Sequence, residues 1–600
     1  MRLKFSILFI VLFWLMLILR VYYLSSNEYY AGIASKNVIK TTELPPVRGQ
    51  IFDANNNPLA INRLGYSLFL RPHLKNEIIE EETKYLEELF LDLNSTKMQR
   101  EYKKQNSPYN QDFIKIVDFL EYEDISPLFS KLNLRKNLRI EPASLRFYPY
   151  SSVASHVVGY VAKANSKDLE TNPLSKLTNI AGKSGVERYY NDILQGKEGK
   201  RLTKVTALNK VVEEISYTKP QSSDITLSID IRLQEYLEDL FSDKSGAVII
   251  MNVDNGEIVA AGSFPEYDLN PFVTGISQKD WTDLIENLDH PFTNKLINGL
   301  YPPGSVIKMS VAMAFLNSGK IDKDKSYFCG GAIELGNHKF RCWSRWGHGK
   351  MNLNDAIRQS CDIYFYEGSL EVGIDFLSSN LEKHGFGKKT GVDLPNEFIG
   401  TVPSKVWKME KYAKPWYMGE TVITSIGQGS FLVTPMQIVK NTAEIASGKG
   451  LTPHFLKKID DNEVSFNTYE VFTPFEKQNL PYIRKAMYEV ANHPKGTAYN
   501  HLKDSIVKIA AKTGTAQVVS IPQSEIVRMK EKDMEYYHRS HAWITGYAPF
   551  DNPKYAVTIL VEHGGGGSST GGPLLKNIFE KLVDMGYISI NNWFQILIFV

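Results

Sequence analysis

A serine and a lysine spaced three positions apart could form a nucleophile and its base. Ser305 and Lys308 have this spacing and directly follow the turn-like segment Tyr301-Pro302-Pro303-Gly304. If the segment is helical, the two side chains share one face, and a serine in the first turn lies beside unpaired backbone N–H groups. Serine alone is a poor nucleophile, but a lysine amine in a dry pocket can take its proton. The pattern therefore indicates an acyl-transfer serine that works without a histidine.

The same spacing occurs at Ser216 with Lys219 and at Ser505 with Lys508. About two matches are expected by chance in a chain this long. The first of these pairs runs into a proline, and the second enters a strand-like stretch, where positions three apart face opposite sides. Only Ser305 follows a turn and begins a helical run, so it is the predicted nucleophile.

The second motif is Ser360-Cys361-Asp362, which follows a helix predicted over residues 352–359. Its serine hydroxyl could relay a proton between a catalytic base and a leaving group. A lone Ser-x-Asp is usually no more than a turn. Its place downstream of Ser305 in the same chain favours a role in one shared site.

The third motif is Lys512-Thr513-Gly514-Thr515, which the apolar stretch 506–511 places on a predicted strand. A cationic strand of this kind can hold a carboxylate. Gly514 has no side chain, so a substrate laid antiparallel along the strand could approach its backbone closely.

Phe5 to Leu24 predicts a membrane-spanning helix. These 20 positions are apolar except for Ser6, Arg20 and two tyrosines, which matches the length that crosses a bilayer. Basic residues precede the run, so the short N-terminus should stay in the cytoplasm and the rest should be exported. The alternative is a cleaved signal peptide, but no small-x-small cleavage site follows directly. We expect an uncleaved anchor.

The composition indicates a folded chain of several domains. Its 600 residues are more than one hydrophobic core usually serves. Of these residues, 43% are hydrophobic and 23% are charged, a composition that suits packed cores. The formal charge of +2 gives no global positive field, which argues against a nucleic-acid binder. A polar linker at 219–223 marks a boundary. The predicted segments are a tail (1–4), an anchor (5–24), a first exported domain (25–222), a second exported domain (223–590) and a tail (591–600).

Local patterns predict several elements. Residues 75–104 carry dense Glu and Lys among Leu and Ile at helical spacing, which predicts a helix with a solvated face. Strand-like runs at 246–251 and 258–261 flank Asp254-Asn255-Gly256, a hairpin signal because Asn-Gly supplies positive φ angles. The apolar residues 593–600 are too few to span a membrane and read as a buried strand or a frayed tail.

In this order, the three motifs resemble those of the penicillin-binding proteins, serine acyltransferases that cross-link peptidoglycan. Gly427-Gln428-Gly429, Thr434 to Gln437 and His541-Ala542-Trp543 agree with that family. Arg48 to Asp53 resembles the first motif of the class B pedestal, although Ala54 replaces the usual Arg and Asn56 the usual Gly. No stretch resembles a glycosyltransferase domain.

The resemblance implies an α+β fold with a single N-terminal transmembrane helix, an elongated and mostly β pedestal over 25–222, and a transpeptidase domain over 223–590. The transpeptidase domain should have the penicillin-binding and serine β-lactamase-like architecture, an antiparallel sheet flanked by helices. The chain would sit in the bacterial inner membrane with this domain in the periplasm.

The family's roles carry over residue by residue. Ser305 would attack the carbonyl of a D-Ala-D-Ala stem peptide with Lys308 as base, and Ser360 would pass a proton to the departing amine. Backbone N–H groups of Ser305 and Thr515 would form the oxyanion hole. β-Lactams should acylate the same serine. The implied catalytic set is Ser305, Lys308, Ser360, Asp362 and Lys512, with Thr513, Gly514 and Thr515 binding the substrate and no cofactor needed for catalysis.

Asp362 also bears on the branch of the family. The division-type branch of class B usually has Asn at this position, whereas the elongation-type branch commonly has Asp. The expected partners are therefore peptidoglycan stem peptides, β-lactams and, in the elongation complex, a membrane glycosyltransferase of the shape, elongation, division and sporulation family. The alternatives are a division-type transpeptidase, a hydrolase such as a D,D-carboxypeptidase or β-lactamase, and a scaffold that activates the glycosyltransferase.

All three cysteines of the chain lie in one stretch with a histidine. Cys329, Cys342, His348 and Cys361 provide a Cys3His set, which can bind zinc tetrahedrally. Some relatives of the elongation branch bind zinc beside the middle motif through residues that match His348 and Cys361. The alternatives are a disulfide between Cys329 and Cys342, with Cys361 as a small buried residue, or neither.

Overall fold

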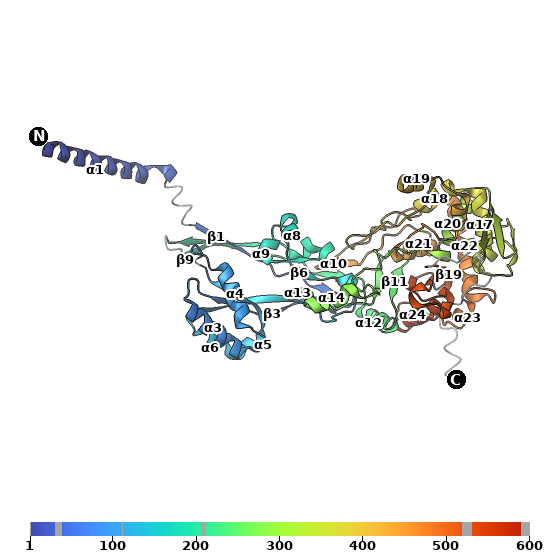
Figure 1. The fold of residues 1–600 in the computed structure, drawn as a ribbon, viewed down its shortest axis with the longest axis horizontal. Coiled ribbons are helices and arrows are strands. Elements are labelled where there is room, and N and C mark those ends of the chain that lie inside the picture. The colour runs from blue at the N-terminus through green and yellow to red at the C-terminus, as the bar shows by residue number, and fades with distance from the viewer. Residues whose placement is uncertain (1, 31–38, 111, 207–210, 519–530, 590–600) are drawn as a thin grey trace. The chain divides into compact units, whose positions relative to one another are not determined.

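The computed structural model describes residues 2–30, 39–110, 112–206, 211–518 and 531–589 (Figure 1). The chain forms two compact units, each described here by itself. One unit comprises Met1–Gly49, Lys163–Ala181 and Asp192–Ser223. The other comprises Gln50–Ala162, Gly182–Asn191 and Asp224–Val600.

The first unit begins with α1 (Arg2–Ser26). Its segment Lys4–Ser26 has 23 residues, a mean hydropathy of 2.5 and exposed side chains throughout, as suits a surface that faces lipid. Within the described ranges it is the one helix long and apolar enough to cross a membrane. The predicted apolar helix is therefore confirmed, and it extends two residues beyond Leu24; that it crosses a membrane stays a prediction.

The rest of the first unit is built on a three-stranded antiparallel sheet. Its order is β1-β8-β9, with Ile39 opposite Lys204 and Lys200 opposite Thr218. Short helices complete the unit. The elements are β1 (Ile39–Leu44), α8 (Ser166–Thr171), α9 (Ser175–Thr178), α11 (Asn191–Gln195), β8 (Gly199–Val205) and β9 (Val211–Thr218).

The second unit contains two large sheets, the first of which joins segments far apart in the sequence. Its strands run in the order β18-β17-β10-β2-β3-β4, with β5 also paired to β3. Residue Ile51 of β2 lies beside Ile225 of β10 in parallel register. The strands are β2 (Ile51–Phe52), β3 (Pro58–Leu70), β4 (Ile114–Glu121), β5 (Leu138–Phe147), β10 (Ile225–Leu227), β17 (Leu456–Ile459) and β18 (Asn462–Glu463).

The helical pattern predicted over 75–104 forms two helices rather than one. Helix α3 (Asn76–Leu89) and helix α4 (Ser95–Gln105) are separated by residues 90–94. The side chain of Asn94 caps α4 by accepting from the N–H of Lys97, because a helix start needs an acceptor for its unpaired donors. Both helices bury an apolar stripe and expose most of their charged residues, as predicted.

The N-terminal region is less rich in strands than the expected mostly β pedestal. Besides its strands it contains the helices α3 to α11, so it is mixed α/β. A polar turn follows β2, where Asp53 is buried and accepts from the backbone of Asn55 and Asn57. Asn56 has a φ of 63°, and asparagine tolerates this left-handed region, which explains how it stands where the family usually has Gly. The remaining short elements are α5 (Tyr122–Ile125), α6 (Phe129–Asn133), α7 (Ser155–Val158), β6 (Val161–Lys163), β7 (Ile180–Gly182) and α10 (Gly185–Tyr189).

The second large sheet carries one of the three motifs. Its five strands run antiparallel in the order β12-β11-β21-β20-β19. The strands are β11 (Gly246–Asn252), β12 (Ile258–Phe264), β19 (Ala510–Ala516), β20 (His541–Ala548) and β21 (Tyr555–Val561). The β11–β12 hairpin was predicted, but its turn differs. Of the loop residues only Gly256 has a positive φ, at 90°, because the loop runs over Val253 to Glu257 rather than over a two-residue Asn-Gly turn.

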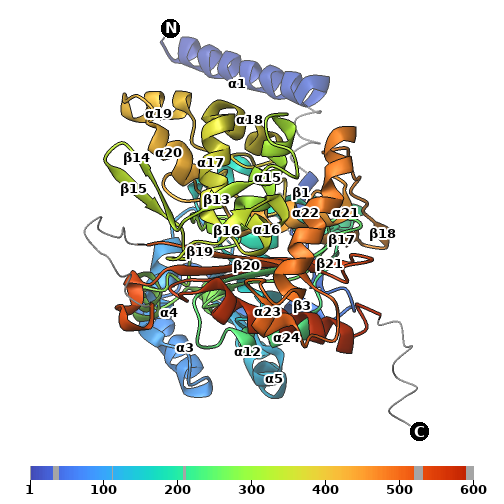
Figure 2. The same ribbon diagram turned by 90° about the vertical axis from the view of Figure 1, so that its right-hand side faces the viewer.

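Helices cover both faces of this sheet (Figure 2). Helices α21 and α22 pack on one face, and α12 and α24 on the other. This is the predicted antiparallel sheet flanked by helices. The helices are α12 (Ile231–Leu240), α13 (Asn270–Thr274), α14 (Gln278–Glu286), α15 (Lys308–Asn317), α16 (Leu353–Arg358), α17 (Asp362–Val372), α18 (Ile374–Lys383), α19 (Lys405–Tyr412), α20 (Met418–Ser425), α21 (Pro435–Ser447), α22 (Pro474–Asn492), α23 (Tyr499–Leu502) and α24 (Gly572–Asp584).

The domain boundaries drawn from the sequence stay a prediction. The first unit ends at Ser223, next to the predicted linker, but residues 50–162 and 182–191 group with the C-terminal part of the chain. The apolar C-terminal segment 593–600 lies outside the described residues.

Candidate active site

Ser305 lies in a single turn of 3₁₀ helix, Gly304–Ile307, and α15 begins at Lys308. The tighter 3₁₀ geometry places residues three apart almost in line, so the two side chains leave the turn on one side. Ser305 is half-buried, and its hydroxyl makes no hydrogen bond within the described ranges. It therefore remains available to an incoming group.

The turn that carries Ser305 is held from two sides. Gly304 has a φ of 55° and donates its N–H to the carbonyl of Gly427 at 2.8 Å. A Cβ at Gly304 would lie 2.8 Å from the carbonyl oxygen of Thr515 on β19, so only glycine fits here. The indole of Trp543 donates to the carbonyl of Pro302 at 3.1 Å. The nucleophile turn is thus fixed against the Gly427 loop and strands β19 and β20.

Lys308 is fully buried and makes three polar contacts from its amine. Its Nζ lies 2.7 Å from Oδ1 of Asp362, 3.0 Å from the carbonyl of Ser360 and 3.3 Å from the hydroxyl of Ser360. Burial raises the pKa of Asp362, and Lys308 acts in the opposite direction because the cation stabilises the carboxylate. Asp362 thereby fixes the position of the Lys308 amine.

Ser360 connects the two lysines of the site. It stands between α16 and α17 with a φ of 53°, a conformation that a non-glycine residue adopts at a cost. Its hydroxyl accepts from Lys512 Nζ at 2.9 Å in addition to Lys308 Nζ. Burial, and next the positive charge of Lys308, lower the pKa of Lys512 well below its ordinary value. One hydroxyl thus contacts the amines of both lysines.

Strand β19 lies at the edge of the five-stranded sheet, with β20 as its one strand neighbour among the described residues. Side chains alternate along a strand, so Lys512 and Gly514 face one side and Thr513 and Thr515 the other. A Cβ at Gly514 would lie 3.0 Å from Val306, which belongs to the turn that carries Ser305. This turn therefore also favours glycine at position 514. An edge strand suits an extended peptide, and in this structure the carbonyl of Thr515 accepts from the side chain of Gln428 at 3.0 Å.

Sequence reasoning missed Thr497, and it noted Trp343 only as a neighbour of the middle motif without giving it a contact in the site. Thr497 shares a 2.8 Å hydrogen bond between hydroxyls with Thr513, and its carbonyl accepts from Ser568. Trp343 donates its backbone N–H to Asp362 at 2.9 Å and its indole N–H to the carbonyl of Ser360 at 3.0 Å. Nothing in the sequence marks Thr497, whereas Trp343 stands next to a cysteine of the predicted metal set.

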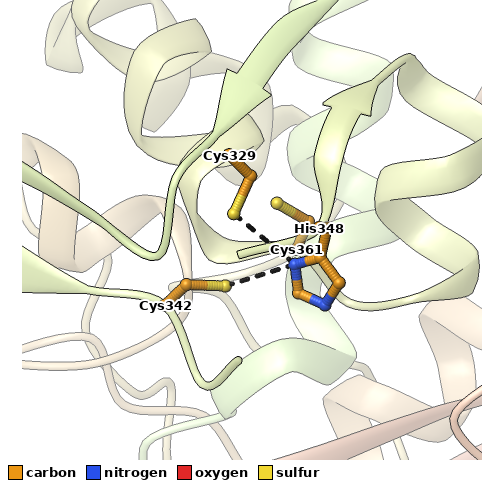
Figure 3. Close-up of side chains that lie close together, drawn as sticks. All are labelled: Cys329, Cys342, His348 and Cys361. Atoms are coloured by element: carbon orange, nitrogen blue, oxygen red, sulfur yellow. Dashed lines mark hydrogen bonds between the residues drawn. The ribbon is translucent and has the colours of Figure 1, made fainter. Parts of the chain in front are cut away.

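The four residues of that set converge (Figure 3). The ligand atoms of Cys329, Cys342, His348 and Cys361 all lie within 4.8 Å of one another. Zinc–sulfur bonds of about 2.3 Å imply sulfur separations of about 3.8 Å in a tetrahedron, so the residues fit this ion. All three cysteines are free thiols, which removes the Cys329–Cys342 disulfide from this structure.

Two further features of the cluster suit a metal. His348 turns Nδ1 toward the sulfurs of Cys329 and Cys342, at 3.5 and 3.6 Å. A hydrogen bond from Cys361, and another from His348, lower the pKa of the Cys342 thiol, and a thiolate is the form that binds zinc. Cys361 lies between Ser360 and Asp362, so the cluster borders the catalytic motif.

The structure thus joins Lys308, Ser360, Asp362 and Lys512 through hydrogen bonds and places Ser305 in the 3₁₀ turn directly before Lys308. The other serines with the same spacing lie outside this cluster. Ser216 is on β9 of the first unit, and Ser505 follows α23 in a turn. The role of each site residue stays a prediction.

A half-buried serine three positions before a buried lysine, a second buried lysine on an edge strand, and a sheet covered by helices are the features that the penicillin-binding resemblance implies. A family model for the penicillin-binding protein transpeptidase domain matches residues 246–584, and one for the penicillin-binding protein dimerisation domain matches residues 43–227. The chain belongs to the penicillin-binding proteins.

Similar proteins indicate the branch of the family to which the chain is most similar. Peptidoglycan D,D-transpeptidase MrdA of Escherichia coli (strain K12) is 33% identical over 568 residues, 92% of this chain and 89% of the relative. A solved complex between penicillin-binding protein PBP2 and MreC from Helicobacter pylori matches with a TM-score of 0.85 at 43% identity, covering 92% of this chain and 99% of that one. A peptidoglycan synthase complex that coordinates polymerization and crosslinking matches with a TM-score of 0.70 at 25% identity, covering 98% and 100%. The motif-based resemblance to an elongation-type class B penicillin-binding protein is confirmed.

Proposed function

We propose that this chain is an elongation-type peptidoglycan D,D-transpeptidase that works through an acyl-enzyme on Ser305. The observation that carries the proposal is the hydrogen-bonded set of Lys308, Ser360 and Lys512 beside the unpaired hydroxyl of Ser305. The E. coli relative with the transpeptidase name, at 33% identity, supports the reaction type.

In the first half of the reaction, Ser305 Oγ forms a bond to the carbonyl carbon of the penultimate D-Ala of a stem peptide. Its proton passes to the Lys308 amine, which the Asp362 carboxylate holds in place. The bond to the terminal D-Ala then breaks, and the departing nitrogen takes a proton through the Ser360 hydroxyl. The product is an ester between Ser305 and the donor peptide.

In the second half, an amine of a neighbouring stem peptide attacks this ester. The amine loses a proton through the same groups, Ser305 regains its hydrogen, and a peptide cross-link results. Backbone N–H groups of Ser305 and Thr515 stabilise the negative oxygen in both steps, and removal of one such donor typically costs about 3 to 4 kcal/mol of barrier. Ser305 stands in the first turn of its helix, where N–H groups lack helical acceptors.

Substrate binding is assigned to the edge strand β19. The terminal carboxylate of the donor peptide pairs with Lys512, Thr513 and Thr515, while the peptide backbone runs along the free edge beside Gly514. β-Lactams imitate this end of the substrate and acylate Ser305 in the same way.

A penicillin-labelling experiment tests the assignment of the nucleophile. The full chain in detergent should react with a fluorescent penicillin, and mass spectrometry should find the label on the peptide that contains Ser305. Ser305→Ala should abolish labelling while circular dichroism stays unchanged, because the half-buried hydroxyl makes no internal hydrogen bond in the described structure. Ser505→Ala serves as the matched control and should label normally. Label on Ser505 or Ser216 would overturn the assignment.

The same proposal covers the cellular setting. Helix α1 anchors the chain in the inner membrane, and the basic residues before it favour a cytoplasmic N-terminus with the catalytic domain in the periplasm. The H. pylori relative solved with MreC and the relative in a peptidoglycan synthase complex support assembly with elongation-complex proteins. We assign a membrane glycosyltransferase of the shape, elongation, division and sporulation family as the polymerising partner.

The proposal also includes structural zinc on Cys329, Cys342, His348 and Cys361. Protein purified without chelator should contain about one zinc per chain, and all three thiols should react with a thiol reagent only after the metal is removed. Cys342→Ser should lose the metal. Protein without zinc and with one free thiol would mean that Cys329 and Cys342 form a disulfide instead.

A further inference from the structure

An exposed group of aromatic and cationic side chains surrounds the predicted metal cluster, and we call it the basic aromatic platform. It consists of Phe328, Trp343, Arg345, Trp346 and Lys350, all of them exposed. The three aromatic side chains are 74%, 57% and 86% exposed in sequence order. Large aromatic side chains seldom stay this exposed beside a catalytic site without a binding role.

The members of the platform are joined by local contacts. Phe328 on β13 (Tyr327–Cys329) stands directly opposite Lys350 on β16 (Gly349–Met351), and cross-strand partners share one face of a sheet. The guanidinium of Arg345 lies over the ring of Trp346, 5.3 Å from its centroid. The platform therefore contains one cation–aromatic pair, Arg345 with Trp346, and one cross-strand pair, Phe328 with Lys350.

The backbone under the platform is fixed. Cys342 donates its N–H to the carbonyl of Gly331 at 2.8 Å, and His348 donates to the carbonyl of Cys329 at 3.1 Å. A Cβ at Gly347 would lie 2.0 Å from the carbonyl oxygen of Cys329, so the two segments touch through their backbones. Substitutions of the outward-facing side chains should leave this frame intact.

Trp343 connects the platform to the catalytic site. Its indole N–H donates to the carbonyls of Gln359 and Ser360, both at 3.0 Å, and its backbone N–H donates to Asp362. The exposed indole is thus in direct contact with the backbone of the residue that joins Lys308 and Lys512. A polymer whose end occupies the catalytic site would extend next onto this surface.

The charges of the platform lack acidic partners. Neither Arg345 nor Lys350 forms an ion pair within the part of the chain that the structure describes. Arginine binds carboxylates through its fork of donors and stacks on flat groups, and tryptophan offers a large rigid face with a polar edge. This chemistry is complementary to a polymer that carries both carboxylates and sugar rings.

Resting on the proposed function, we propose that the basic aromatic platform binds the un-cross-linked peptidoglycan strand beyond its reacting D-Ala-D-Ala end. Arg345 and Lys350 pair with carboxylates of the stem peptides, and the indoles of Trp343 and Trp346 cover sugar rings. Binding of such remote parts lowers the KM for the long substrate and leaves small substrates unaffected, because only the long substrate reaches the surface.

The test compares a long and a short substrate on the full chain in detergent. The long one is a preformed glycan strand with uncross-linked stem peptides, and the short one is a fluorescent penicillin. Trp346→Ala and Arg345→Glu should each raise the KM for cross-linking of strands about fivefold with little change in kcat, and should leave the rate of penicillin acylation unchanged. Added salt should weaken strand cross-linking by the wild type more than by Arg345→Glu, because screening acts on the same charge.

A matched control is available at Lys323, whose amine lies 4.7 Å from the ring centroid of Tyr482, an exposed pair of the same kind. Lys323→Glu and Tyr482→Ala should behave as wild type with both substrates. Unchanged strand cross-linking in the platform variants would overturn this inference while normal penicillin acylation leaves the proposed function standing. An equal loss with both substrates would also overturn it, since that result means distortion of the site. A wild type that reacts with neither substrate would instead refute the proposed function.

Discussion

At the scale of single residues, the central feature of the site is one serine hydroxyl that two lysine amines share as a hydrogen-bond acceptor. Lys308 and Lys512 both donate to one hydroxyl, that of Ser360, and Asp362 neutralises one of the two amines. Burial, and next the positive charge of Lys308, lower the pKa of Lys512, because two cations so close in a dry pocket repel each other. In the proposed mechanism, Lys308 is the base that takes the proton of Ser305.

A pH-dependent prediction concerns His541, at the start of β20. Burial, and next the neighbouring His563, lower its pKa from 6.5 to about 4. The unfolded chain therefore binds more protons than the folded chain between these values, and the free energy of unfolding falls as the pH drops through that window. His541→Asn should remove this slope, so that the wild type loses about 1 to 3 kcal/mol more stability than the variant on acidification from neutral pH.

Thermal melts across that range measure the effect. The exposed His338 provides the control, and His338→Asn should keep the wild-type slope. Parallel slopes for His541→Asn and wild type would show that His541 does not titrate as its surroundings require.

Residue types with a known chemical use could be read from the sequence, whereas partners defined only by folding could not. Ser305, Lys308, Ser360 and Lys512 stood out because their spacing and order form a motif. Thr497 gave no such signal, since its contact with Thr513 arises when α22 and the loop after it pack against β19. The metal set was found because cysteines are rare in this chain.

At the scale of elements, the active site is a contact between a strand and a turn. Strand β19 and the 3₁₀ turn touch through glycine on both sides, at Gly514 and at Gly304. A strand and a turn can approach this closely only where side chains are missing. The position of Thr515 relative to Ser305, and with it the oxyanion hole, therefore depends on these two glycines.

Gly514→Ala tests this contact. The new methyl group would lie 3.0 Å from Val306 and 3.2 Å from the carbonyl oxygen of Pro303, so the strand must shift by a few tenths of an ångström. We expect penicillin acylation to slow about tenfold, equal to ~1.4 kcal/mol of barrier, with the fold retained. The double variant Gly514→Ala with Val306→Ala should recover part of the rate because it removes the nearest clash. Equal rates in the single variant and the wild type would exclude a positional role for this glycine.

Local patterns predicted the existence of elements better than their ends. The run over 75–104 has a continuous helical period, yet residues 90–94 interrupt it, because Asn94 offers a cap that starts a second helix. The hairpin around Gly256 was recognised from composition, but its five-residue loop depends on pairing between β11 and β12. The 3₁₀ turn at Ser305 was read as ordinary helix, since both have the same short-range sequence signal.

At the scale of the whole molecule, motifs and composition gave the membrane helix, the transpeptidase fold and the family, while the grouping of segments required the structure. Strand β2 joins β10 in parallel register, and β10 joins β17 more than two hundred positions later. Such pairing brings residues 50–162 into the same unit as the catalytic sheet. No local pattern contains this information, because it comes from contacts between distant segments.

A truncation tests whether the N-terminal helix serves membrane attachment alone and is not needed for the reaction with penicillin. Removal of residues 1–26 takes away the one apolar helix in the described ranges that could hold the chain in a bilayer. The shortened protein should remain in the supernatant after membranes are sedimented and should react with penicillin at about the full-length rate, because the site lies wholly in the second unit. Full-length protein, as control, should sediment with the membranes. A truncated chain that no longer reacts would mean that the anchor supports the site.

The free edge of β19 has one more consequence. An unpaired strand can recruit a second copy of itself as readily as it can a ligand, and natural sheets discourage this by placing an inward-pointing charge on the exposed strand. Lys512 places a polar amine of this kind, fully buried, on the outermost strand of its sheet. Replacement of Lys512 by methionine should therefore weaken substrate binding and also promote aggregation of the purified protein. Light scattering at high protein concentration would measure the aggregation.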